Sequence, residues 1–143
     1  MVSRCRMSRP KPLAILGAFA LTLCLSSCSR IFDVRPTGSI QQGIIFRFYK
    51  PDAPKPSRFR ISRLFVEQHT AHGWKLVWSM EGARSLSAIT YGTSYRGLNE
   101  SRRAPQLVRG QLYRVAGRSD GLFGGADFLI DHSGAVVIRP PTI

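Results

Sequence analysis

The stretch RFRISRLFVEQ, residues 58–68, is the clearest strand pattern in the chain. Over its first half, apolar and polar side chains alternate with the period of two that is typical of a half-buried β-strand. The apolar positions on one parity are Phe59, Ile61 and Phe65. Leu64 and Val66 break the alternation, so either both faces of the strand are covered near its end or a β-bulge shifts the register.

A second strand pattern follows after the short turn HTAHG, residues 69–73. In WKLVWSM, residues 74–80, the large apolar side chains again share one parity. These are Trp74, Leu76, Trp78 and Met80. We therefore predict that residues 58–80 form a β-hairpin with one large aromatic side.

Five further segments have strand composition, and turn or loop sequences separate them. The strand segments are 43–50, 85–92, 107–117, 126–131 and 134–140. The separators include a three-proline loop at 51–57, a turn at 81–84, a polar loop at 93–105 and a glycine-rich turn at 117–125. No segment keeps a helical period over three turns. Seven short strands in residues 43–143 predict an all-β fold, an antiparallel β-sandwich.

The segment LVRGQLYRV, residues 107–115, adds a more specific feature. Leu107 lies six residues before Tyr113, with Gly110 between them. This resembles the tyrosine corner of fibronectin type III and related immunoglobulin-like domains. The resemblance implies that Leu107 enters the core and that the Tyr113 hydroxyl bonds back to the backbone. It also implies a core tryptophan, for which Trp74 or Trp78 is suitable.

The N-terminus has the organisation of an export signal. Residues 1–12 contain four basic residues and no acidic residue, and residues 13–25, LAILGAFALTLCL, contain no charge. An apolar run of this length is shorter than the roughly 20 residues of a membrane-spanning helix. It matches the apolar region of a signal peptide behind a positive N-terminal region.

The apolar run ends in Leu25-Ser26-Ser27-Cys28. This resembles the lipobox of bacterial lipoproteins, which implies cleavage before Cys28 and acylation of its thiol. Cys24 fits less well because Leu23 precedes it where a small residue is expected. The alternatives are an ordinary signal peptide and an uncleaved anchor.

The lipobox implies a signal peptide at residues 1–27 and a lipidated tether at residues 28–42, followed by the sandwich domain at residues 43–143. Ser29, where an aspartate would favour the inner membrane, implies the outer membrane, on its periplasmic side. No cysteine follows Cys28, so the domain contains neither a disulfide nor a cysteine-ligated metal.

The chain is strongly basic, with 21 Lys and Arg against 8 Asp and Glu. Loss of residues 1–27 would leave a net charge of +9, because four basic residues lie there. A basic surface suits anionic lipid, nucleic acid or an acidic ligand. Arg58, Arg60, Arg63 and Lys75 are candidates for one basic sheet face beside aromatic residues. Export disfavours nucleic acid, and the alternative is that the arginine stems cover apolar surface while their charged ends stay in water.

Catalytic and metal-binding patterns are weak. Glu67, His69 and His72 lie close together in EQHTAH, with His132 on a distant turn, but histidines at this spacing in a hairpin turn do not converge as they would on a helix. The consecutive Asp131-His132-Ser133 is typical of a turn rather than a catalytic triad. We expect no cofactor, no metal and no catalytic residue.

The loop around residues 93–103 is the best candidate for a protein contact. It lies beside Tyr91 and contains Tyr95, Arg96 and Leu98. Tyrosine and arginine are enriched at interface centres. We expect a lipid-anchored envelope protein with a non-catalytic binding or structural role and an envelope or periplasmic protein partner. The alternatives are a small envelope hydrolase and an inhibitor or immunity protein of an envelope-directed toxin.

Overall fold

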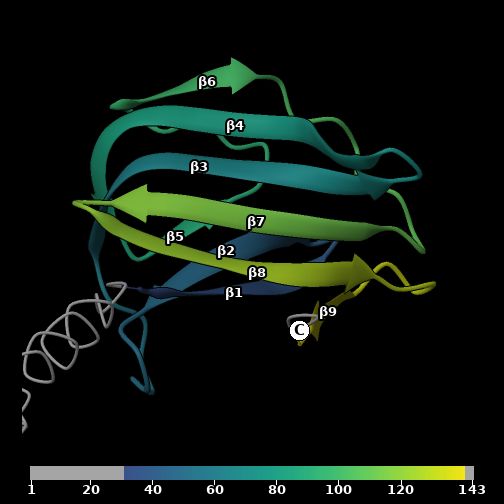
Figure 1. The fold of residues 1–143 in the computed structure, drawn as a ribbon, viewed down its shortest axis with the longest axis horizontal. Coiled ribbons are helices and arrows are strands. Elements are labelled where there is room, and N and C mark those ends of the chain that lie inside the picture. The colour runs from purple at the N-terminus through teal and green to yellow at the C-terminus, as the bar shows by residue number, and fades with distance from the viewer. Residues whose placement is uncertain (1–30, 141–143) are drawn as a thin grey trace, which may run out of the picture.

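A computed structural model describes residues 31–140 of the chain, and its strands are shown in Figure 1. The strands are β1 (Asp33–Ser39), β2 (Gly43–Tyr49), β3 (Phe59–Thr70), β4 (Gly73–Leu86), β5 (Ala88–Thr90), β6 (Leu98–Arg102), β7 (Leu112–Ser119), β8 (Leu122–Ile130) and β9 (Val136–Arg139). Within these residues no helix has the length and apolar character needed to cross a membrane. The lipobox at Leu25–Cys28 lies outside the described residues.

The strands form two antiparallel sheets, which confirms the predicted all-β sandwich. One sheet has the order β1-β2-β5, and the other has the order β6-β4-β3-β7-β8-β9. The three-stranded sheet lies behind the six-stranded sheet in Figure 1. Side chains from both inner faces fill the space between them. The largest fully buried ones include Trp78, Tyr113, Phe46, Phe48 and Phe128.

The described residues contain nine strands, two more than the sequence pattern predicted. The first addition is β1, which lies in the segment predicted as a tether. All seven residues of β1 pair with β2. Phe32, just before the start of β1, is 2% exposed, and Val34, the second residue of β1, is 3% exposed. Pro36 and Gly38 are rare in strands, so the sequence pattern did not predict one here. A proline is tolerated because β1 is an edge strand of its sheet. The sandwich therefore begins near residue 31 and not at residue 43.

The second addition is β6, which lies inside the predicted polar loop 93–105. It pairs with the edge of β4 and buries only its first residue, Leu98. An edge strand with one buried side chain shows no apolar alternation, so its sequence looks like a loop. The predicted turn at 81–84 is also part of a strand, because β4 continues to Leu86. β7 begins at Leu112, later than predicted, and β8 begins at Leu122, earlier than predicted.

The β3–β4 hairpin was predicted correctly, but two register shifts change which side chains face the core. The first shift lies between Ile61 and Arg63, which confirms the bulge alternative and turns Phe65 to the outer face. The second lies opposite Val77, where Val66 pairs with Trp78 and Glu67 pairs with Leu76. Trp78 is consequently buried, whereas Trp74 lies on the outer face. The prediction of a single aromatic side was wrong for Trp74 and Leu76.

The corner before β7 has the geometry expected from the sequence. The backbone N–H of Val108 donates a hydrogen bond to the Tyr113 hydroxyl at 2.9 Å. Leu107 is 4% exposed and belongs to the core. Burial raises the pKa of Tyr113, so the hydroxyl stays protonated at neutral pH.

Two isolated β-bridges join the segment 31–39, which contains β1, to the part of the chain that forms the end of the six-stranded sheet. Ile31 pairs with Phe123 in parallel, and Ser39 pairs with Ala135 in antiparallel orientation. The backbone N–H of Phe32 donates to the Phe123 carbonyl at 3.0 Å. β8 can approach Phe32 this closely because Gly124 has no side chain. A Cβ at this position would lie only 2.3 Å from the Phe32 carbonyl oxygen. The first described residues are thus fixed against β8.

Candidate binding surface

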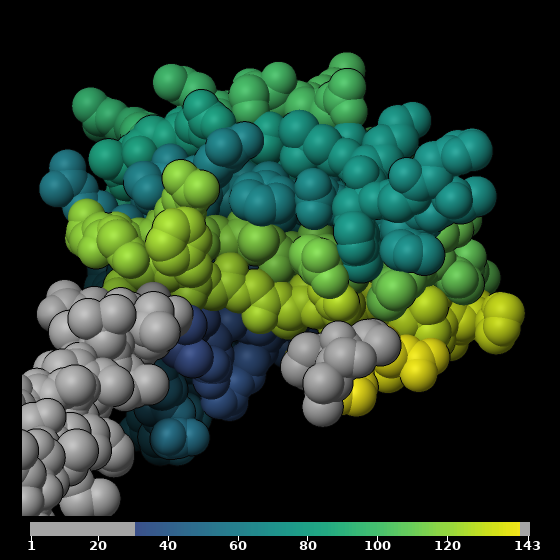
Figure 2. Space-filling model, viewed as in Figure 1, coloured from purple at the N-terminus to yellow at the C-terminus, as the bar shows by residue number. Residues whose placement is uncertain are grey.

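Three arginines lie over aromatic rings on the outer face of the six-stranded sheet, which Figure 2 views directly. The distance from guanidinium carbon to ring centroid is 5.4 Å for Arg63 and Phe65, 4.1 Å for Arg114 and Trp74, and 4.9 Å for Arg118 and Phe123. Such distances allow cation–π attraction. We call these six residues the arginine–aromatic face.

Strand register brings the pairs together. Arg63 lies opposite Arg118 across β3 and β7, and Arg118 lies opposite Phe123 across β7 and β8. Arg114 and Arg118 stand on outward positions of β7, whose alternate positions, such as Val115, are buried. Alternation therefore places one set of side chains in the core and the other set on this face.

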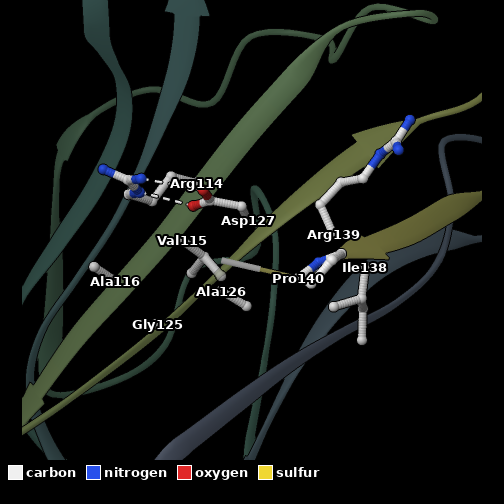
Figure 3. A pocket seen from close by; sticks show the side chains of 9 residues that line it. All are labelled: Arg114, Val115, Ala116, Gly125, Ala126, Asp127, Ile138, Arg139 and Pro140. Atoms are coloured by element: carbon white, nitrogen blue, oxygen red, sulfur yellow. Dashed lines mark hydrogen bonds and ion pairs between the residues drawn. The ribbon is translucent and has the colours of Figure 1, made fainter. Parts of the chain in front are cut away.

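Arg114 is held most firmly. Its Nε and Nη2 donate to the two carboxylate oxygens of Asp127 at 2.7 and 3.1 Å, as the dashed lines in Figure 3 show. The hydrogen bond that Arg114 donates to Asp127 raises the pKa of Arg114 above its ordinary value. Two-point contact and stacking on Trp74 keep the guanidinium in one orientation. A partner would therefore meet a pre-ordered group.

Between these residues the face is hollowed. Ala116 and Gly125 are cross-strand neighbours on β7 and β8, and both line two adjoining hollows of about 420 and 400 Å³. Arg114, Asp127 and Ile138 border the first hollow (Figure 3), and Phe65 and Phe123 border the second. We call the two hollows together the trough.

The trough exists because small residues sit between large ones. Gly125 cannot carry a side chain without strain, since a Cβ there would lie 2.7 Å from the Val115 carbonyl oxygen. Phe123 beside it is 53% exposed. An exposed ring next to a depression offers apolar contact, and the arginines offer charge. This combination is typical of interface centres in proteins.

The predicted contact residues around loop 93–103 lie near one another, but much of their surface is used internally. Leu98 is 5% exposed and belongs to the core. The Tyr91 hydroxyl donates to the Pro105 carbonyl at 2.8 Å, and the Tyr95 hydroxyl accepts from the Thr90 N–H at 2.8 Å. Burial raises the pKa of Tyr91. Arg96 is exposed, and its carbonyl accepts a hydrogen bond from Arg84.

The histidines are spread over exposed turns. His69 lies near the end of β3, His72 lies in the β3–β4 turn, and His132 lies in the turn before β9. His69 and Gln111 border an open hollow. Glu67, His72 and His132 do not line this hollow. In residues 31–140 no group of three or more histidine, cysteine or acidic side chains is arranged to hold a metal ion. The structure does not bring the EQHTAH residues together with His132.

The other candidates are also placed. Asp131 accepts hydrogen bonds from the Ser133 hydroxyl at 2.6 Å and from the Ala135 N–H at 2.9 Å, which makes this segment a turn. Of the predicted basic face, Arg63 belongs to the arginine–aromatic face, while Arg58 donates to the Ser85 carbonyl at 2.9 Å. Lipidation of Cys28 and cleavage at Leu25, Ser26 and Ser27 lie outside the described residues and stay predictions.

Sequence reasoning missed most of the surface described above. Arg114, Ala116 and Asp127 lie in predicted strand segments whose outward positions carried no motif, and Gly125 lies in the segment that was predicted as a glycine-rich turn. The available signal was the alternation along residues 112–119, where arginines occupy two of the four outward positions, 114 and 118. Comparison of the chain with protein-family models, with curated protein sequences and with solved structures gives no match.

Proposed function

We propose that this chain is a bacterial lipoprotein whose sandwich is a non-catalytic binding module. Acylated Cys28 anchors it in the outer membrane on the periplasmic side, and its partner is an envelope protein. The basic N-terminal region, the 13-residue uncharged run and the lipobox support the anchor. Two or more acyl chains give stable anchoring, whereas one gives only reversible binding.

The observation that carries the binding role is the trough on the arginine–aromatic face. Its rim combines Phe65 and Phe123 with Arg114 and Arg118, and its floor is small and apolar. A matching partner element would insert an apolar side chain at Ala116 and Gly125 and bring a carboxylate to Arg118, because Arg63 already forms an ion pair with Glu81 at 3.2 Å. Arg114 is already paired with Asp127, so it contributes orientation and stacking surface more than free charge.

The strand order supports an immunoglobulin-like architecture for this module. β1, β2 and β5 correspond in order to strands A, B and E, and β3, β7 and β8 correspond to C, F and G. Tyr113 lies at the start of the strand that corresponds to F, where a tyrosine corner belongs. The chain departs from this architecture at the core tryptophan, because Trp78 is on β4 and not on β3.

The binding role is tested by photo-crosslinking in the cell that makes the protein. A photoreactive residue replaces Ala116 in the trough, and the control replaces Thr37, which is exposed on β1 of the other sheet. We expect one discrete adduct from position 116 and none from position 37. Filling the trough with Ala116→Leu, with the probe moved to Phe65 on the trough rim, should abolish the adduct. Equal labelling at both positions, or an adduct that survives Ala116→Leu, contradicts the proposal.

The anchor is tested by the intact mass of protein extracted from membranes. We expect a chain that begins at Cys28 and carries acyl chains, and we expect Cys28→Ala to lose both the acyl mass and the membrane association. An unmodified mass, or a mass that retains residues 1–27, contradicts the anchor.

A further inference from the structure

Strand register gathers one set of chain ends at a single end of the sandwich. β1, β3 and β8 begin there, and β2, β4 and β7 finish there. In Figure 1 the start of β1, the loop between β2 and β3 and the turn between β7 and β8 lie on this side of the molecule. We call it the N-terminal end. Ile31 belongs to it because it is bridged to Phe123.

The connection between Cys28 and this end is short. Three peptide links separate the Cα atoms of Cys28 and Ile31, so these atoms lie at most about 11 Å apart. The hydrogen bond from the Phe32 N–H to the Phe123 carbonyl fixes the start of the domain at 3.0 Å. A 15-residue tether would let the domain move far from the membrane, but the observed start of the fold removes most of that length.

The N-terminal end has the surface chemistry of a membrane-contacting region. Ile31 and Phe123 are 54% and 53% exposed, and they are neighbours in space. Five exposed basic residues lie at this end, and Arg118 is over the Phe123 ring: Lys50, Lys55, Arg58, Arg60 and Arg118. The acidic residues at this end are Asp33, Asp52 and Asp120. Apolar side chains flanked by Lys and Arg suit the interface of an anionic bilayer.

The opposite end is also basic, so charge alone does not choose between the ends. Lys75, Arg102, Arg103 and Arg109 are exposed there. Attraction to an anionic surface is screened over about 8 Å at physiological ionic strength. Only the N-terminal end is held within roughly that range of the bilayer by the position of Cys28.

We propose that the N-terminal end lies against the anionic surface of the bilayer that holds the acyl chains, with Ile31 and Phe123 at the headgroup level. The strands then stand away from the membrane. The part of the arginine–aromatic face around Arg114 and Trp74 remains open to the periplasm, whereas its Phe123 edge meets the headgroups. This inference rests on the proposed acylation of Cys28. The site it assigns is a lipid contact that shares Phe123 with the near edge of the trough and leaves the first hollow, beside Arg114 and Asp127, uncovered.

The test uses acylated protein extracted from membranes and placed in vesicles of phosphatidylethanolamine and phosphatidylglycerol. Because Cys28 would be the only cysteine of the processed chain, one introduced cysteine can be labelled selectively. A fluorescent label at Pro54→Cys reports on the N-terminal end, and the matched label at Ala71→Cys, in the β3–β4 turn, reports on the opposite end. Both positions are exposed. A fraction of the lipid headgroups carries a nitroxide quencher.

We expect several-fold stronger quenching at position 54 than at position 71. Lys50→Glu with Arg60→Glu should reduce the quenching at position 54, whereas Arg103→Glu with Arg109→Glu at the other end should leave it unchanged. Equal quenching at both positions of acylated protein overturns this inference and leaves the anchor intact. Insensitivity to the first charge reversal overturns the electrostatic contact. An intact mass without acyl chains overturns the anchor and this inference together.

Discussion

Phe32→Ala tests whether the segment before residue 43 is part of the fold. Phe32 is 2% exposed, stacks on Phe59 at 5.0 Å and meets Phe48 edge-on at 5.9 Å between ring centroids. Its ring packs over Gly117 and Gly124, which have no side chains that could fill the space left by the ring. Removal of a buried phenylalanine side chain costs about 3–5 kcal/mol of unfolding free energy. This is a large share of the 5–15 kcal/mol that is typical of a domain.

The assay is equilibrium urea unfolding of the chain from Ser29 to Ile143, followed by tryptophan fluorescence, since Trp78 is fully buried. With an m-value of about 2 kcal/mol per molar urea, a loss of 4 kcal/mol lowers the midpoint by about 2 M. Ile31→Ala is the matched control. Ile31 is adjacent but 54% exposed, so its loss should change the free energy by about 0.5 kcal/mol.

A loss of about 0.5 kcal/mol or less for Phe32→Ala would fall within the range of surface substitutions and would refute the reasoning. It would mean that residues 28–42 are the tether that the sequence pattern predicted. The short-anchor argument for membrane contact would then fail as well. A large loss with an unchanged m-value is the expected result, because the variant should still unfold in one cooperative step.

Three further predictions concern stability. Gly124→Ala should lower the unfolding free energy by about 1–3 kcal/mol, because the new Cβ would displace β1 from Phe32; an unchanged urea midpoint would contradict this close approach. Tyr113→Phe should cost about 1 kcal/mol in the same assay, because the Val108 N–H loses its acceptor, and a neutral substitution would show that water replaces the bond. Burial raises the pKa of both Tyr91 and Tyr113 above about 10, the value in the unfolded chain. Their contribution to the unfolding free energy should therefore be fully present below about pH 10 and should be lost as the pH rises further. Urea unfolding between pH 8 and 11 checks this, and Tyr91→Phe should flatten the profile.

Local patterns predicted the parts of the fold that depend on neighbours in the chain. Alternation at residues 58–68 and 107–117 indicated strands because a half-buried strand needs it. The Tyr113 corner was predictable because both partners of its hydrogen bond lie five residues apart. β1 and β6 were missed because edge strands tolerate Pro36 and polar residues that an inner strand would exclude.

The candidate surface depends on registers that no single segment contains. A bulge is defined by the partner strand, so the shift opposite Val77 that turns Trp74 outward toward Arg114 could not be read from residues 74–80. The trough joins Ala116 and Gly125 from two strands, and the bridge from Ile31 to Phe123 spans most of the chain.

The sequence by itself determined the sandwich class, the tyrosine corner and the pattern that implies a lipid anchor, since each depends on periodicity or spacing within a short segment. Only the tertiary structure decided where the domain begins, which aromatic residues leave the core and which basic residues share an end with Ile31. These properties arise from pairing between distant strands, where each one-residue shift moves a side chain to the opposite face of the sheet.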